Sequence, residues 1–444
     1  MSIQLREIKL ILSIAMPLMA AFLAQKGMQL IDTIMMGWIG PEALAAGVLG
    51  TGIFITNVVF CLGVLSAAGI QIARALGANE HDHIRESLLH GIYLVCMLSV
   101  PCMFILWFSP YLLHYLGNEP NVLEKTIELL HGLMWGFPGF LLFFVFREFF
   151  AAFSLTRIVM LIVLCILPLT YIGNYIFIYG KFGLPPMGVV GIGYAGAIIM
   201  WLMFFSMYGF SKLIKKLNQH LFSIHDLTFD YRIILSMLKV GLPSGILFVL
   251  DSGMFTTATF LMAHFGVDAL AAHSIAMQCA SFVYAVPFGL SMTIALQVGH
   301  AAGAKDLVRA KRIGYTGLFI GLFLSFIIGL LFILVPQLFI RLFLDGQPVD
   351  TKIIEYAVAF LFVAALFQCF DVLQAIMNGA LRGFKDTFIP MLLCISCFWI
   401  LGIGSSYYLG FYTPLGAMGI WYGLTIGLFS ASVVLLIRFI RKPI

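Results

Sequence analysis

Three aspartates stand inside long apolar stretches of the chain, at Asp32, Asp251 and Asp371. An unpaired carboxylate at the centre of a bilayer costs ~2.5–3.5 kcal/mol on insertion, so it is kept mainly where it faces water, an ion or a partner. Asp251 and Asp371 are expected to reach the same depth. Two carboxylates at one depth can hold Na⁺ together with neutral oxygens, or share one proton. The alternative is an Asp neutralised by protonation or by a hydrogen bond from a neighbouring helix.

Four further polar side chains fall at membrane depth. Lys26 is a cation near the middle of the first stretch, where it either pairs with an acid or extends along a neighbouring helix. Its neighbour Gln25 lies one heptad before Asp32 and shares its helix face. Asn174 and Gln278 are uncharged, and helix-to-helix hydrogen bonding is the reading we prefer for Gln278. We take Lys26, Gln25 and Gln278 as candidate supporting residues.

The elements that must position these residues are transmembrane helices. Of the 444 residues, 62% are hydrophobic and 10% are charged, against about 25% charged in soluble domains, so a soluble enzyme is excluded. Each apolar stretch is continuous rather than alternating, which indicates helices and not a barrel. Twelve stretches are long enough to span a bilayer, at 10–35, 46–72, 88–113, 127–152, 158–180, 188–213, 233–262, 270–298, 313–340, 353–377, 387–409 and 415–437. We expect an all-α membrane protein with twelve transmembrane helices.

The distribution of positive charge predicts the orientation. Most of the 25 Lys and Arg residues lie on one side when both termini are placed in the cytoplasm, as the positive-inside rule requires. The net charge of +5 is therefore a topology signal, and no nucleic-acid partner is expected. The first stretch lacks a small-residue cleavage site, so we expect a retained helix rather than a signal peptide.

An internal repeat predicts the architecture. A shift of 226 residues aligns 17–91 with 243–317 without a gap, at 17 identical positions of 75, and places Pro17 on Pro243. Six spans separate the copies, so the repeats are parallel, with a pseudo-twofold axis along the membrane normal and a cavity between two bundles. We expect an N-terminal six-helix bundle at 1–213, a cytoplasmic linker at 214–232 and a C-terminal six-helix bundle at 233–444. The two prolines are candidate hinges, although a purely structural kink is an equal alternative.

Motifs for soluble chemistry are missing from the sequence. It contains no G-x-x-x-x-G-K-[ST] loop, no H-E-x-x-H and no G-x-S-x-G, so we expect no enzyme, no cofactor and an ion gradient as the energy source. His81, His83 and His90 are expected to form a solvated face rather than a metal site. Arg147 and Glu148 lie about one turn from the end of the fourth stretch, where we expect them to extend to the interface.

Three blocks resemble the multidrug and toxic compound extrusion (MATE) family. The first is the run from Pro17 to Ala46, with Asp32-Thr33 and Ala43-Leu-Ala-Ala46. The second is Gly241-Leu-Pro243 followed by Asp251 and Ala269-Leu-Ala-Ala-His273. The third and most specific is Asp371-Val-Leu-Gln374 with Gly379-Ala-Leu-Arg-Gly-Phe-Lys-Asp386. The resemblance covers nearly the whole chain and is closest to the bacterial NorM-like branch.

The resemblance implies an antiporter that exports organic cations and drugs in exchange for Na⁺ or H⁺. It implies that Asp251 and Asp371 form the cation site, and that Asp32 with Asn174 carries proton or substrate coupling. Two positions depart from the family pattern: Asp251 stands where the Na⁺-linked branch typically has Glu, and Lys26 where a small polar residue is expected.

From these features we expect alternating-access export of amphipathic, cationic compounds by a monomer. It should be a multi-pass protein of the inner membrane, with small molecules and membrane lipid as its partners. The alternative within transport is a flippase for lipid-linked precursors, which usually has more spans and a more cationic cleft. An intramembrane aspartyl protease would need a G-x-G-D signature, which the sequence lacks. A scaffold would leave the buried carboxylates without a reason.

Overall fold

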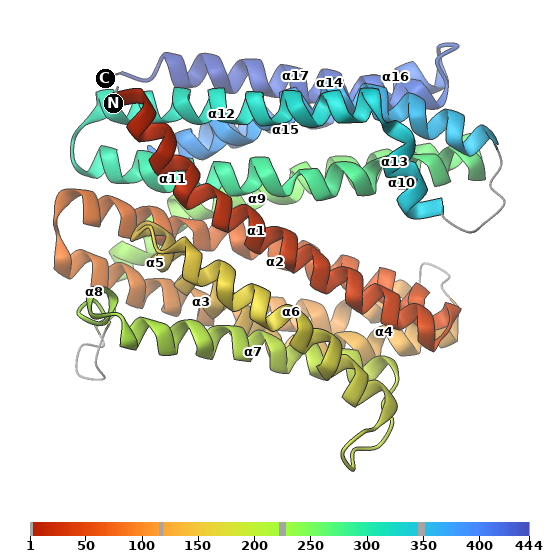
Figure 1. Ribbon diagram of the computed structural model, residues 1–444, viewed down its shortest axis with the longest axis horizontal. Coiled ribbons are helices and arrows are strands. Elements are labelled where there is room, and N and C mark those ends of the chain that lie inside the picture. Colours follow the sequence, from red (N-terminus) through yellow and green to blue (C-terminus); the bar gives the residue numbers. More distant parts are fainter. Residues whose placement is uncertain (1–2, 115–118, 222–227, 345–350, 444) are drawn as a thin grey trace. The chain divides into compact units, whose positions relative to one another are not determined.

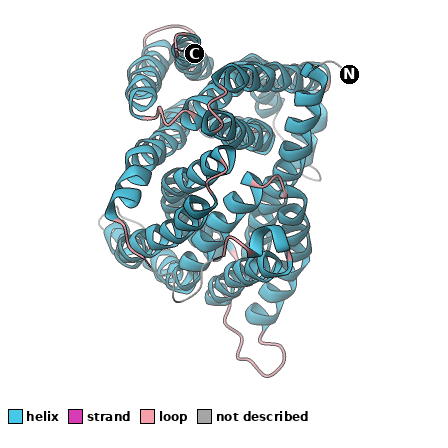
Figure 2. Ribbon diagram, turned by 90° about the vertical axis from the view of Figure 1, so that its left-hand side faces the viewer, coloured by secondary structure: helices cyan, strands magenta, loops and turns pink. Residues whose placement is uncertain are grey.

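A computed structural model describes residues 3–114, 119–221, 228–344 and 351–443. This described part of the chain is helical and contains no strand (Figure 2). Within the described ranges, twelve helical segments, several of them made of two or three consecutive elements, are long and apolar enough to cross a membrane. The predicted all-α class and the twelve stretches are therefore confirmed. The predicted linker at 214–232 includes residues 222–227, which lie outside the described part.

The chain divides into two compact units. The N-terminal unit is Ala20–Gly245, and the C-terminal unit consists of Met1–Met19 and Ile246–Ile444. The chain therefore passes from one unit to the other inside α1 (Ile3–Ile39) and inside α9 (Tyr231–Met262). Each boundary lies two residues after one of the matched prolines, Pro17 in α1 and Pro243 in α9. The bundle boundaries at 213 and 233 stay a prediction.

The helices of the N-terminal unit are packed through close backbone contacts. A Cβ on Gly132 would lie only 2.8 Å from the Cα of Gly193, so α4 and α7 can touch only because both residues are glycine. Between α1 and α9 this unit holds α2 (Pro41–Ala78), α3 (His81–His114), α4 (Pro120–Leu133), η1 (Met134–Gly136), α5 (Phe137–Ala152), α6 (Thr156–Tyr179), α7 (Val189–Leu213) and α8 (Lys215–Asn218).

Helix α14 is the central element of the C-terminal unit and packs against α11, α12 and α17 (Figure 1). A Cβ on Gly379 of α14 would lie 2.4 Å from the backbone oxygen of Ser291 in α11. The Ser291 hydroxyl donates to the Ala375 carbonyl over 2.6 Å. This unit holds η3 (Ala263–Phe265), α10 (Val267–Val283), α11 (Ala285–Gly303), α12 (Leu307–Leu334), α13 (Pro336–Leu344), α14 (Thr351–Gly383), α15 (Phe388–Ile395), η4 (Ser396–Ile403), α16 (Gly404–Phe411) and α17 (Ala417–Ile440).

One predicted boundary is wrong by several residues. The ninth stretch was expected to continue to residue 340, but α12 ends at Leu334 and a separate helix, α13, begins at Pro336. Proline has no backbone N–H to donate, and it disfavours a helical conformation of the residue before it. Hydropathy does not detect this break because the residues on both sides of it are apolar.

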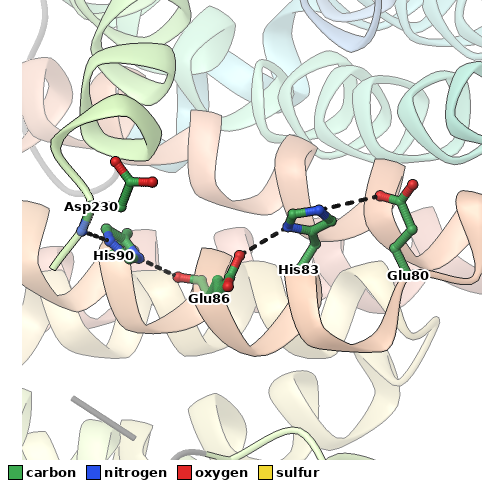
Figure 3. Close-up of polar contacts among 5 residues, drawn as sticks. All are labelled: Glu80, His83, Glu86, His90 and Asp230. Carbon is green, nitrogen blue, oxygen red and sulfur yellow. Dashed lines mark hydrogen bonds and ion pairs between the residues drawn. The ribbon is translucent and has the colours of Figure 1, made fainter. Parts of the chain in front are cut away.

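The first turns of α9 are held against α3 within the N-terminal unit (Figure 3). His90 lies 2.7 Å from the carbonyl oxygen of Glu86 through Nδ1, and its Nε2 lies 2.9 Å from the backbone nitrogen of Asp230. A carbonyl can only accept and a backbone N–H can only donate, so the proton is on Nδ1 and Nε2 is the acceptor. Asp230 in turn accepts from the N–H of Arg232 over 2.8 Å and caps α9. His90 thus anchors the start of α9.

The histidine prediction is therefore wrong for one residue. His81 and His83 are exposed as expected, but the His90 side chain is fully buried. Its ring packs against Tyr93 and Phe229. Burial is tolerated because both ring nitrogens have hydrogen-bond partners. No cluster of three or more potential metal ligands occurs within the described ranges.

The first turns of α1 are anchored in the C-terminal unit. Glu7 pairs with Arg312 of α12 over 2.9 Å. Nearer its proline, the same segment packs closely on α11, because a Cβ on Gly289 would lie 3.1 Å from the backbone nitrogen of Met19. The matching contact in the N-terminal unit joins Gly63 of α2 to Gly245, where a Cβ would lie 2.4 Å from Cα. The repeat shift places Gly63 on Gly289 and Met19 on Gly245, so the two anchored segments are equivalent.

Candidate cation and coupling sites

The two central aspartates of the C-terminal unit form a buried acidic pair. Asp251 of α9 and Asp371 of α14 are 8% and 5% exposed. Their charges act on each other, so the two carboxylates lie within electrostatic range. In each residue one carboxylate oxygen, Oδ1, is buried without a hydrogen-bond partner among the described residues. A pair of this kind repels itself unless a cation or a proton neutralises it.

Neutral polar groups surround the acidic pair. Gln368 and Gln374 lie three residues before and after Asp371 on α14, so they are neighbours along one stripe of that helix. Both are buried, and the side-chain carbonyl oxygen of each lacks a hydrogen-bond partner within the described ranges. Tyr284, between α10 and α11, lies within range of electrostatic interaction with both aspartates. Carboxylate and amide oxygens are suitable ligands for a hard monovalent cation.

Tight helix packing holds Asp251 in place. Two residues after it, Gly253 admits the ring of Trp399, whose nearest ring carbon would lie 3.2 Å from an added Cβ. Trp399 belongs to η4, a π-helical segment that widens the eleventh span. Such segments frequently occur at functional sites, because the extra residue in the turn redirects side chains.

In the N-terminal unit the structure brings Asp32 and Asn174 together. The side-chain nitrogen Nδ2 of Asn174 on α6 donates to Oδ1 of Asp32 on α1 over 2.6 Å. Asn174 is fully buried and Asp32 is half-buried. Gly27 lets α1 approach Leu167 of α6 one turn earlier, since an added Cβ would lie 3.3 Å from that side chain. The carboxylate of this unit is therefore held by a neutral amide and not by a second acid.

The supporting candidates separate into different environments. Lys26 and Gln25 are half-buried on α1, and Lys26 forms no ion pair with the described residues of its own unit. Gln278 on α10 has an exposed side chain. Pro17 and Pro243 are buried inside α1 and α9. Among the described residues, neither Lys26 nor Gln278 therefore forms a direct hydrogen bond with the candidate acidic residues of its own unit.

Arg147 and Glu148 do not extend to the interface, so that expectation is wrong. Arg147 of α5 is 3% exposed, and its Nη2 lies 3.2 Å from Oε1 of Glu148. Its guanidinium lies over the rings of Phe22 and Phe144, 4.7 and 4.1 Å from their centroids. Gly69 of α2 makes room for Glu148, because an added Cβ would lie 2.7 Å from Oε2. Tight packing leaves these side chains no path to the surface.

Sequence reasoning missed Gln368, Gln374 and Tyr284 around the acidic pair. Gln368 and Gln374 carried a detectable signal, because amides three residues on either side of an intramembrane acid share its helix face. Tyr284 carried none, since tyrosine is common in membrane helices. It also missed the packing of Arg382, whose guanidinium carbon lies 5.1 Å from the centroid of the Phe248 ring.

Comparison with known proteins is consistent with the repeat. The MatE family model matches residues 17–176 and again residues 243–408. The two matches begin at Pro17 and Pro243, which the internal repeat superimposes. Multidrug resistance protein NorM of Photobacterium profundum is 34% identical over 439 residues, which cover 98% of this chain and 95% of that protein. Probable multidrug resistance protein NorM of Pseudomonas aeruginosa is 35% identical over 435 residues, covering 98% and 89%.

Solved structures share the fold at lower identity. The eukaryotic MATE transporter AtDTX14 superimposes with a TM-score of 0.87 at 21% identity, covering 99% of this chain and 97% of that one. A MATE protein in complex with MaL6 superimposes with a TM-score of 0.89 at 21% identity, covering 98% and 95%. The family model matches more than half of the chain, and relatives above 30% identity span nearly all of it, so this multi-pass membrane protein belongs to the MATE family.

Proposed function

We propose that this protein is a secondary antiporter that exports amphipathic, cationic organic compounds in exchange for Na⁺ or H⁺. The observation that carries the proposal is the acidic pair of the C-terminal unit. Asp251 and Asp371 are buried, close in electrostatic terms, and each keeps a carboxylate oxygen without a described hydrogen-bond donor. A buried pair of this kind is stable only when it binds a cation or a proton. A reversible ion site at membrane depth is the requirement for ion-coupled transport.

The substrate class is argued from the N-terminal unit and from the relatives. Asp32 keeps a carboxylate that is half-buried and only partly satisfied by Asn174, so it can attract an organic cation or accept a proton. The NorM relatives are named multidrug resistance proteins. We therefore assign cation binding to Asp251 and Asp371, and proton or substrate coupling to Asp32 with Asn174. Lys26, Gln25 and Gln278 are assigned supporting roles.

Coupling requires that the ion and the substrate prefer different conformations, because a ligand with equal affinity for two states drives no transition. We propose alternating access in which cation binding at the acidic pair, or protonation of Asp32, favours the state that releases substrate outside. We propose a monomer in the inner membrane with both termini in the cytoplasm, and the distribution of positive charge supports this placement of the termini.

Pro17 and Pro243 are proposed as the hinges of this motion. Each proline lies between a helix start anchored in one unit and a helix end that belongs to the other. Proline removes one helical hydrogen bond and lowers the cost of bending there. Replacing both prolines with alanine should slow transport while equilibrium binding of substrate stays unchanged. An equal loss of binding and transport would contradict a hinge role.

The test of the function is efflux of a fluorescent cationic dye from proteoliposomes. A Na⁺ gradient and a pH gradient are imposed separately on the parent and on Asp251→Asn, Asp371→Asn and Asp32→Asn. Asp82→Asn, at an exposed position at the start of α3, is the matched control. We expect one gradient to drive efflux in the parent and the control, and each of the three buried substitutions to abolish it. If neither gradient moves dye through the folded parent, the antiporter proposal is wrong.

A further inference from the structure

The start of α12 and the end of α17 are joined at one end of the C-terminal unit (Figure 1). The Lys311 ammonium of α12 donates to the backbone carbonyl oxygen of Ile440 in α17 over 3.0 Å. One turn later on α12, the ring of Tyr315 lies edge-on to that of Phe439, with 5.4 Å between the two centroids. The Lys311 ammonium is therefore held beside the last turn of α17.

This contact brings two cations to neighbouring positions. Arg441 directly follows Ile440, whose carbonyl oxygen accepts from Lys311, so the two positive side chains start from adjoining places on two packed helices. Arg441 is exposed and Lys311 is half-buried. Two like charges held this close together repel each other unless an anion lies near both of them.

Other cations at this end of the unit have acidic partners. The ion pairs have nitrogen–oxygen distances of 2.7–4.0 Å and join Glu7 to Arg309 and Arg312, and Asp386 to Arg438 and Lys442. Asp306 accepts from the backbone N–H of Arg309 over 2.9 Å. Within the part of the chain that the structure describes, neither Lys311 nor Arg441 forms an ion pair. These two cations thus form a site of unbalanced positive charge.

An exposed apolar stripe continues along α12 from Lys311 into the membrane span. Its members recur every three to seven residues on the helix face that also carries Lys311, and they are Val308, Tyr315, Phe319, Phe323 and Phe326. A phospholipid has the same layout, with a phosphate at the membrane surface and acyl chains below it. The stripe alone is what any lipid-facing helix shows, so the specificity comes from the two cations.

We propose that Lys311 and Arg441 form a binding site for the phosphate group of an anionic phospholipid, whose acyl chains lie along the exposed stripe of α12. Basic side chains between transmembrane helices at the cytoplasmic surface are suited to anionic headgroups, and each cation strengthens binding about fivefold. The bound phosphate links α12 to α17, just as Glu7 links α1 to α12. The site does not involve the acidic pair, so it is independent of the proposed antiport.

The first experiment titrates the purified full-length protein, in uncharged detergent micelles, with phosphatidylglycerol that carries a fluorescent acyl chain. Fluorescence anisotropy reports binding. The double variant Lys311→Gln with Arg441→Gln should bind about 25-fold more weakly than the parent, because it loses both cations. The matched control is Arg157→Gln with Lys215→Gln, which removes two exposed cations from the N-terminal unit and should bind as the parent does. Equal weakening in both double variants would mean that the lipid responds only to total charge, which would overturn the proposal.

Two competitors identify the ligand. Phosphatidylcholine with the same acyl chains carries no net charge, and soluble glycerol phosphate has the phosphate without the chains. Both should displace the labelled phosphatidylglycerol much less well than unlabelled phosphatidylglycerol does. Equal displacement by phosphatidylcholine would indicate an apolar surface without headgroup specificity. Equal displacement by glycerol phosphate would indicate a site for free phosphate. Either result would refute the lipid site.

Single variants separate phosphate binding from a structural role of Lys311. Arg441→Gln leaves the contact between Lys311 and Ile440 in place and should still weaken binding of phosphatidylglycerol about fivefold. Lys311→Arg keeps the charge and a donor and should bind as the parent does. Phosphatidylglycerol should also raise the midpoint of thermal unfolding more in the parent than in Arg441→Gln, since only a ligand that binds the folded state stabilises it. An Arg441→Gln protein with the affinity of the parent would show that the site is wrongly assigned.

Discussion

The two units solve the problem of buried charge in opposite ways. In the N-terminal unit both the candidate acid and the buried arginine have a close polar neighbour, since Asp32 accepts from Asn174 and Arg147 pairs with Glu148. In the C-terminal unit the charges of Asp251 and Asp371 repel each other, and each keeps a carboxylate oxygen without a described partner. The N-terminal unit is therefore closer to electrostatic balance on its own. A cation or a proton would neutralise this pair, which is why we propose the coupling ion there.

The comparison also shows how one repeat can acquire two roles. Phe22 and Phe248 occupy equivalent positions, and each supports a buried arginine. Asp32, by contrast, aligns with Ala258, and Asp251 aligns with Gln25. The scaffold that holds the arginines has been kept in both halves, whereas the carboxylates stand at different depths. Equivalent ring positions with displaced acids agree with our proposal that the C-terminal half binds the ion and that the N-terminal half carries the other coupling role.

The largest effect should come from separating the ion pair of the N-terminal unit. Arg147→Gln leaves Glu148 buried without its cation and should destabilise the protein by about 3–5 kcal/mol, whereas Arg147→Gln with Glu148→Gln should be close to neutral. Denaturant unfolding in detergent micelles measures the difference. A single variant as stable as the double variant would show that the pair does not provide the balance described above.

A direct comparison of the two acidic sites should give the next largest effect. Asp371→Asn should weaken Na⁺ or proton binding by at least about 100-fold, which corresponds to about 2.7 kcal/mol. Asp32→Asn should change Na⁺ binding by less than about threefold and instead weaken binding of a cationic dye, because Asp32 is assigned to proton or substrate coupling and not to the cation site. Equilibrium ion binding and dye fluorescence anisotropy report the two quantities. Equal loss of ion binding in both variants would contradict the proposal that the two acidic sites have different roles.

Removing the side-chain amide near each acidic site should change stability differently in the two units. Asn174→Leu removes the donor to Asp32 and should cost about 1.5–3 kcal/mol of stability, the usual range for a hydrogen bond to a charged group. Gln374→Leu removes a carbonyl oxygen without a described partner, so stability should be unchanged or higher while ion affinity falls. Thermal unfolding of both variants, with and without the coupling ion, tests this. A destabilised Gln374→Leu protein would show that this oxygen has a structural partner.

The smallest effect concerns pH and the end of the C-terminal unit. Asp386 follows α14 and accepts from Arg438 over 2.8 Å and from Lys442 over 2.7 Å. Partial burial raises its pKa, but these hydrogen bonds and charges outweigh burial and hold the pKa below its ordinary value. A lowered folded-state pKa gives stability that is present above the unfolded-state pKa of about 3.9 and is lost as pH falls through the folded value.

We therefore expect a loss of about 0.2–1 kcal/mol below pH 4, the range for partly exposed ion pairs. Asp386→Asn should remove this pH dependence, whereas Asp306→Asn should retain it, because it removes a carboxylate at the start of α12 but keeps an oxygen that accepts from the Arg309 N–H. Thermal unfolding between pH 3 and 6 provides the measurement. The same slope in the parent and in Asp386→Asn would assign the effect to other acids.

The sequence alone determined the class, the number of spans, the repeat and the three acids. These features are local or periodic: hydrophobic length reports a membrane helix, and a charge inside an apolar stretch is conspicuous because of its insertion cost. The two matched prolines were found in the same way. The end of α12 was not, because apolar residues continue past the break at Pro336.

Only the tertiary structure decided which side chains meet. Asn174 and Asp32 are 142 residues apart, and a family resemblance, not their spacing, suggested the pair. Arg147 was expected to reach the interface, but it is buried and its guanidinium lies over the rings of Phe22 and Phe144. The contact of Arg382 with Phe248 had no sequence signal at all. Periodicity reports the face on which a residue lies, whereas contacts between faces depend on how distant helices pack, which is fixed by close glycine approaches spread along the chain.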